Sequence, residues 1–154
     1  MIVYRIERSK YLSQTLSGRG AALATSNRWN SRHTPMIYTS EHRSLAMLEV
    51  AVHMNLNTHL PSDRLILEIE IPDDIDIGVI EENDLPRGWD NKPPSKSTQL
   101  IGDYFISDRS YLAVKVPSAI IKREYNVLIN PLHHDMGSIY VRASEPFRFD
   151  DRLG

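Results

Sequence analysis

Residues 36 to 53 read Met-Ile-Tyr-Thr-Ser-Glu-His-Arg-Ser-Leu-Ala-Met-Leu-Glu-Val-Ala-Val-His, a pattern that predicts a short strand followed directly by a helix. The strand takes Met36 to Thr39, and Ser40 is a suitable N-cap for a helix that extends to Met54. From Ser44 onward the helix is apolar on nearly every side, so we expect it to be largely buried.

Two ionisable side chains interrupt the apolar part of this helix. Glu49 and His53 are one turn apart and therefore lie on the same face. A buried carboxylate costs several kcal/mol unless it has partners, so Glu49 needs either a structural arginine partner or a functional role. His53 by itself is more typical of a satisfied core histidine than of a catalyst.

The composition is that of an ordinary globular protein. Of the 154 residues, 41% are hydrophobic and 25% are charged, which predicts one domain over residues 1–154 with a proper core. A net charge of -2 argues against a broad nucleic-acid-binding surface, and the lack of cysteine excludes disulfides and thiolate chemistry. No apolar run approaches the roughly 18 residues of a membrane span, and the N-terminus lacks the parts of a signal peptide. We therefore expect a cytoplasmic protein that neither enters a membrane nor binds nucleic acid directly.

The rest of the chain alternates between short apolar stretches and polar turns. Strand-like patterns occur at residues 2–6, 64–71, 75–80, 111–116, 126–129 and 138–142, and the tail from 146 to 150 predicts a further short piece. Residues 97–107 carry apolar side chains at helical spacing, whereas 17–31 and 81–97 predict loops. Since the helices do not alternate regularly with the strands, we predict a single mixed α+β domain rather than a doubly wound parallel sheet.

Three side chains in this pattern suit one ligand. Arg28, Tyr38 and Glu49 are separated by ten and eleven residues across a loop, a strand and a helix, a path that can bring all three to one cleft. Together they offer an anion-binding fork, an aromatic plate and a carboxylate, which suit a phosphate, a flat ring and a carbon that develops positive charge. A nicotinamide dinucleotide has all three. No Gly-x-Gly-x-x-Gly follows a strand, so a Rossmann hydride-transfer enzyme is not supported.

A second polar cluster, His133-His134-Asp135, raises the question of a metal site. The chain has no cysteine and no second His-x-x-x-His pair. We therefore expect no metal at this turn.

Several stretches, taken in order, resemble the RES domain family, the toxin half of bacterial toxin–antitoxin pairs, which is named for Arg, Glu and Ser. The resemblance covers essentially the whole chain and departs at Thr25-Ser26-Asn27, where the family usually has glycines. The matching stretches are Val-Tyr-Arg-Ile at 3–6, Asn-Arg-Trp-Asn at 27–30, Ile-Tyr-Thr-Ser-Glu at 37–41, Leu-Glu-Val-Ala-Val-His at 48–53, Val-Pro-Ser-Ala at 116–119, Asn-Val-Leu-Ile-Asn-Pro-Leu-His at 126–133 and Phe-Arg-Phe-Asp-Asp-Arg-Leu at 147–153.

The resemblance implies a fold related to ADP-ribosyltransferases, with NAD as a substrate and no cofactor. In that setting Glu49 would face the nicotinamide ribose, Arg28 would bind the pyrophosphate or a phosphate acceptor, and Tyr38 would pack against nicotinamide. Arg5 would be a second residue for phosphate. The remaining residues expected to line or orient the pocket are His53, Ser118 and Asn130.

Function and partners follow from the same resemblance. It implies a toxin that splits nicotinamide from NAD by phosphorolysis or hydrolysis, and a partner antitoxin with an Xre-like DNA-binding part. Two alternatives stay open, an ADP-ribosyltransferase that modifies a protein and a non-enzymatic module that only binds a partner. The sequence leaves open the acceptor of ADP-ribose and whether the chain forms a homo-oligomer.

Overall fold

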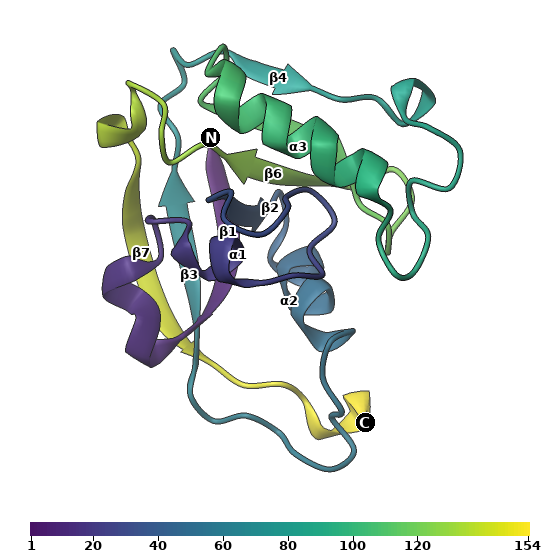
Figure 1. The fold of residues 1–154 in the computed structure, drawn as a ribbon. Coiled ribbons are helices and arrows are strands. Elements are labelled where there is room, and N and C mark those ends of the chain that lie inside the picture. The colour runs from purple at the N-terminus through teal and green to yellow at the C-terminus, as the bar shows by residue number, and fades with distance from the viewer.

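A single seven-stranded sheet organises the computed structural model, which describes all residues from 1 to 154 (Figure 1). The strands are arranged in the order β4-β5-β6-β2-β1-β3-β7, and every neighbouring pair is antiparallel except the parallel pair β4 and β5. Their bounds are β1 Ile2–Arg8, β2 Ile37–Ser40, β3 Arg64–Glu70, β4 Ile77–Val79, β5 Ala113–Pro117, β6 Tyr125–Ile129 and β7 Tyr140–Phe147. The predicted mixed α+β fold is confirmed.

Three α-helices and four short 3-10 helices complete the chain. α2 packs against β1 and β2, while α1 and α3 lie in front of the sheet in the view of Figure 1. None of the helices combines the length and the apolar character that crossing a membrane requires. The bounds are η1 Ser9–Gln14, α1 Arg19–Leu23, α2 Arg43–Ala51, η2 Glu82–Asp84, α3 Lys96–Asp108, η3 Met136–Ser138 and η4 Asp151–Leu153.

Alternation along the central strands divides the core between the two faces of the sheet. In β6, Val127 and Ile129 belong to a cluster with Val3, whereas Leu128 belongs to a second cluster with Phe105 of α3. The second cluster also contains Trp29 and Trp89, which anchor the two long loops of the chain. The face that carries α3 therefore also fixes the loops that surround the cavity described below.

The helix predicted from Ser40 to Met54 is shorter than expected. Ser40 remains in β2, where it pairs with Asn126 of β6, and α2 begins at Arg43 with His42 as N-cap. The helix ends at Ala51. The expected N-cap role of Ser40 is therefore wrong, because strand pairing continues one residue further than the local pattern indicated.

The expected burial of this helix is wrong as well. Within α2 only Leu45 and Ala46 are fully buried, since one face packs on β1 and β2 while the rest borders solvent or the cavity. Val52, just after the helix, is 46% exposed, and Glu49 is half-buried rather than buried. The apolar stretch of the sequence therefore extends beyond the part of the helix that the sheet covers.

A glycine allows α3 to approach the loop before β2. An added Cβ at Gly102 would lie 1.6 Å from the carbonyl oxygen of Trp29, so no larger residue fits there without moving the loop. The same loop is tied to α3 by hydrogen bonds from the Ser31 backbone to Asp103 (3.0 Å) and from Gln99 to the carbonyl of Asn27 (2.9 Å). The loop that carries Arg28 is therefore held in place by α3.

Candidate active site

A cavity of about 580 Å³ opens between α2, the loop before β2 and the segment around residue 92. Its size is within the range of about 300–1,000 Å³ that small-molecule sites occupy. The residues expected from the sequence that line it are Arg5, Arg28, Tyr38, Glu49 and His53. The path through a loop, a strand and a helix does bring Arg28, Tyr38 and Glu49 to one cavity.

Glu49 is held by two neutral donors on one of its carboxylate oxygens. Its Oε1 accepts hydrogen bonds from Asn126 Nδ2 at 2.5 Å and from Ser118 Oγ at 3.1 Å. No arginine forms an ion pair with Glu49, and its Oε2 accepts no hydrogen bond from the protein. The arginine partner considered from the sequence is therefore absent, and one oxygen remains free for a ligand.

Arg28 fastens a distant loop to the cavity wall with one nitrogen and keeps the others available. Its Nη1 donates to the carbonyl oxygens of Trp89 (2.7 Å) and Asn91 (3.1 Å), whereas Nε and Nη2 make no hydrogen bond to the protein. Burial lowers the pKa of Arg28, and the negative charges of Glu49 and Asp90 oppose that shift. The guanidinium remains charged despite this burial, so Arg28 offers the N–H groups of two nitrogens, Nε and Nη2, to an anion.

Tyr38 is fixed by its hydroxyl group. The hydroxyl donates to Asn30 Oδ1 at 2.7 Å and accepts the backbone N–H of Trp29 at 3.1 Å. Burial raises the pKa of Tyr38 well above its usual range, so the phenol stays neutral. Since these two hydrogen bonds hold the hydroxyl in the protein, the ring is the part of Tyr38 that we expect a ligand to contact.

Arg5 lines the cavity but is largely occupied by the protein. Its Nε and Nη2 donate to Glu7 Oε2 at 3.2 and 3.0 Å, and its Nη1 donates to the carbonyl oxygen of Tyr38 at 2.9 Å. Arg5 therefore joins β1 to β2 beneath the site. Its expected contact with phosphate would have to use the remaining N–H groups.

The other expected pocket residues fall into three different environments. His53 lies exposed in the turn after α2 and lines the cavity, but its ring makes no hydrogen bond to Glu49. Ser118 is buried and reaches the site only through Glu49. Asn130 is fully buried beside α3, where it donates to the carbonyl of Ile106 at 3.0 Å and lies outside the cavity lining. Asn130 therefore does not contact the cavity, because its amide is bound to the end of α3.

Sequence reasoning missed Asn126 and assigned Ser40 a different task. Asn126 lines the cavity and contacts Glu49, which is 77 residues away in the chain. Ser40 Oγ donates to Asn126 Oδ1 at 2.6 Å. Lys92 also lines the cavity and adds a third cation to its wall. No local pattern marks these residues, since their contacts depend on the pairing of β2 with β6 and on the path of a loop.

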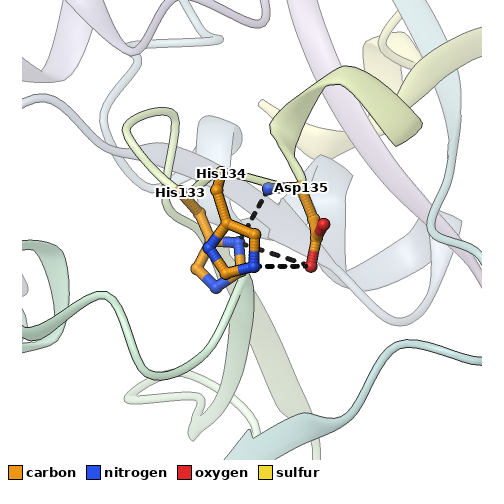
Figure 2. Close-up of side chains that lie close together, drawn as sticks. All are labelled: His133, His134 and Asp135. Carbon is orange, nitrogen blue, oxygen red and sulfur yellow. Dashed lines mark hydrogen bonds and ion pairs between the residues drawn. The ribbon is translucent and has the colours of Figure 1, made fainter.

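The His133-His134-Asp135 cluster lies outside the cavity and is explained by its own hydrogen bonds. Figure 2 shows the two imidazole rings stacked beside the Asp135 carboxylate, with ring centroids 4.2 Å apart. His133 Nδ1 accepts the backbone N–H of Asp135 at 3.1 Å, so in the neutral ring the proton is on Nε2. Burial and the neighbouring His134 lower the pKa of His133, which favours that neutral ring. Neither nitrogen of His133 then has a free lone pair for a metal ion.

Comparison with known proteins decides the family. The sequence model of the RES domain matches residues 2–150. The chain belongs to the RES domain family. The resemblance seen in the sequence is confirmed.

Relatives of this RES domain match along nearly their whole length. A protein named Toxin Res from Photorhabdus laumondii is 38% identical over 155 residues, which cover 99% of this chain and 97% of the relative. A protein named Prs ADP-ribosylating toxin from Sphingobium sp. is 35% identical over 145 residues, covering 93% and 89%.

A solved structure has the same fold. A chain in the crystal structure of the M. tuberculosis MbcT–MbcA toxin–antitoxin complex superposes with a TM-score of 0.74 at 18% sequence identity. The match covers 99% of this RES domain and 85% of that chain. At this level of identity the likeness establishes the architecture of the sheet and its helices.

Proposed function

We propose that this RES domain is the toxin of a toxin–antitoxin pair and that it consumes NAD by breaking the bond between nicotinamide and ribose. The observation that carries the proposal is one cavity in which a carboxylate with a free oxygen, a guanidinium with free N–H groups and an aromatic ring meet. Relatives named Toxin Res support the assignment as a toxin.

The chemistry requires stabilisation of positive charge rather than a strong acid. When the glycosidic bond breaks, its electron pair goes to the pyridinium nitrogen, and nicotinamide leaves as a neutral molecule. The ribose carbon and ring oxygen then share a positive charge. The Glu49 carboxylate stabilises that charge and accepts hydrogen bonds from the ribose hydroxyls through its free Oε2.

The cations on the cavity wall suit the diphosphate. Arg28 binds it with the N–H groups that no protein carbonyl uses, and Lys92 and the remaining N–H groups of Arg5 add positive charge. The Tyr38 ring packs against nicotinamide. These contacts hold the dinucleotide so that its ribose faces Glu49.

The acceptor of the ADP-ribosyl group is water or inorganic phosphate in this proposal. Transfer to a protein is the second candidate, and the name of the Sphingobium relative, Prs ADP-ribosylating toxin, favours it. All three acceptors attack the same cation. NAD labelled in its adenine ring separates them, because the label ends on free ADP-ribose, on a phosphorylated ADP-ribose or on protein.

The test of the proposal is release of nicotinamide by the purified chain. We expect free nicotinamide from the wild-type protein and background levels from Glu49→Gln. If neither protein consumes NAD, the chain is a binding module and the proposal is wrong.

An antitoxin is the proposed partner, since the structural neighbour is part of a toxin–antitoxin complex. The resemblance to the RES family adds the expectation that this antitoxin has an Xre-like DNA-binding part. Expression of the chain in the bacterial cytoplasm is expected to stop growth, and co-expression of the gene beside it is expected to restore growth. Growth arrest by the Glu49→Gln variant at equal protein level would contradict the link between toxicity and NAD consumption.

A further inference from the structure

We propose that Ser40 and Asn126 are positioning residues that hold the Glu49 carboxylate in one orientation, so that one of its two equivalent oxygens faces the ribose, an inference that rests on the proposed function. They form a chain of hydrogen bonds that runs from β2 through β6 to α2. Neither residue is part of the set that the sequence assigned to the cavity.

Two donors converge on the same oxygen of Glu49. Asn126 Nδ2 lies 2.5 Å and Ser118 Oγ lies 3.1 Å from Oε1, so rotation of the carboxylate would break both hydrogen bonds. Ser118 is itself held, since its Oγ accepts the backbone N–H groups of Ile120 at 3.0 Å and Ile121 at 3.1 Å. The carboxylate is therefore asymmetric, with Oε1 committed to the protein and Oε2 free.

The carboxylate of Glu49 only accepts hydrogen bonds, so it requires the NH₂ end of the Asn126 amide, and Ser40 stabilises that orientation from the other side. Its hydroxyl donates to Asn126 Oδ1 at 2.6 Å, which directs the amide NH₂ group toward the carboxylate. A flipped amide would set its carbonyl oxygen against the carboxylate oxygen, two acceptors without a proton between them. The hydroxyl of Ser40 therefore supports the orientation that the charge of Glu49 selects.

The sheet holds this chain of hydrogen bonds in place. Ser40 and Asn126 are direct partners in the β2–β6 register, and they are only 3% and 9% exposed. Their positions depend on backbone pairing and not on flexible side chains. The arrangement is therefore formed before a ligand arrives, as preorganisation of a charge-stabilising group requires.

Loss of the positioning chain is expected to lower kcat more than it raises KM, because charge on the ribose develops only in the transition state. Asn126→Ala removes a hydrogen bond to a charged group and is expected to lower kcat about ten- to hundredfold. Ser40→Ala removes a neutral hydrogen bond and is expected to lower kcat about two- to tenfold.

Asn130→Ala is the matched control. Asn130 follows the same strand, is fully buried and is hydrogen-bonded, but it lies outside the cavity. Its loss is expected to lower the Tm and to leave the kcat of the folded protein unchanged. If Asn126→Ala changes only the Tm, or raises KM alone, Asn126 has a structural role and the proposal is wrong.

Asn126→Asp supplies a signature that a structural role would not produce. The carboxyl group that this substitution introduces can donate to Glu49 only while it is protonated, and once ionised it sets two like charges together. The activity of the variant relative to wild type is therefore expected to fall as pH rises from about 5 to 8. Arg28 stays charged and Tyr38 stays neutral over this range, so neither changes the ratio. His53 lines the same cavity but is present in both proteins, so its effect cancels from the ratio. A ratio independent of pH would overturn the proposal.

A measurement on the resting protein covers the case in which a variant does not fold. In ¹⁵N-labelled protein, the side-chain NH₂ signal of Asn126 is expected to move upfield in the isosteric Glu49→Gln variant, because a charged acceptor is replaced by a neutral one. An unchanged signal would contradict the hydrogen bond. Failure of the proposed function looks different, since the wild-type protein itself would then release no nicotinamide.

Discussion

Replacement of Glu49 by glutamine removes one charge and turns one acceptor oxygen into a donor NH₂ group, with little change in shape. Glutamine has nearly the same volume, and its side-chain oxygen can accept the hydrogen bonds that Asn126 Nδ2 and Ser118 Oγ now give to Oε1. The NH₂ group then takes the place of Oε2 and faces the cavity. The variant is therefore expected to keep its fold, but it loses the hydrogen bonds that Oε2 accepts from the ribose hydroxyls.

The attraction between the Glu49 carboxylate and the positive charge on the ribose determines how far the rate of nicotinamide release falls in this variant. Two unit charges about 4 Å apart interact with about 4 kcal/mol at an effective dielectric constant of about 20, a value that suits a half-buried group such as Glu49. Since about 1.4 kcal/mol corresponds to a factor of ten, the rate of nicotinamide release is expected to fall about a thousandfold.

The assay follows free nicotinamide from purified protein and NAD by chromatography. Glu70→Gln is the matched control, because Glu70 is also half-buried and accepts a hydrogen bond, from the Tyr140 hydroxyl at 2.7 Å, but lies outside the cavity. Its rate should equal that of wild type. A Glu49→Gln rate within about tenfold of wild type, at equal Tm, would refute the electrostatic role of Glu49.

Three further predictions test other parts of the structure. Arg28→Ala is expected to raise the KM for NAD about ten- to hundredfold with a smaller change in kcat, which steady-state kinetics would measure; an unchanged KM would exclude phosphate binding. Tyr38→Phe leaves Asn30 Oδ1 and the Trp29 N–H without a partner, so urea denaturation should show a loss of about 1–3 kcal/mol while turnover continues. Burial lowers the pKa of His133 from 6.5, so the unfolded chain binds its proton more tightly and stability should fall as pH drops below that value. The urea midpoint should therefore decrease less between about pH 7.5 and 5.5 in His133→Gln than in wild type, and an equal decrease would contradict the assignment.

Strands with a clear alternation were predicted closely from the sequence. The pattern at residues 64–71 predicts a strand, and β3 covers Arg64–Glu70 with Leu67 and Ile69 buried. The last strand was predicted too short, since β7 continues to Phe147 through polar residues and Pro146. An edge strand with exposed side chains carries no alternation, and its hydrogen bonds to β3 come from a distant part of the chain.

The site could be predicted only where the residue type itself carried the chemistry. Arg28, Tyr38 and Glu49 were found because a guanidinium, a ring and a carboxylate suggest one ligand in combination. Asn126 was missed and Asn130 was chosen instead, although they are four residues apart on and just after one strand. Their different surroundings, α2 for Asn126 and the end of α3 for Asn130, depend on helix packing that no local pattern encodes.

Proton NMR of NAD mixed with the purified wild-type chain tests the central claim most directly. The proposal predicts that the pyridinium signals of NAD disappear and that those of free nicotinamide grow at the same rate. NAD that stays intact in the presence of folded protein would contradict the claim that this cavity cleaves the bond between nicotinamide and ribose.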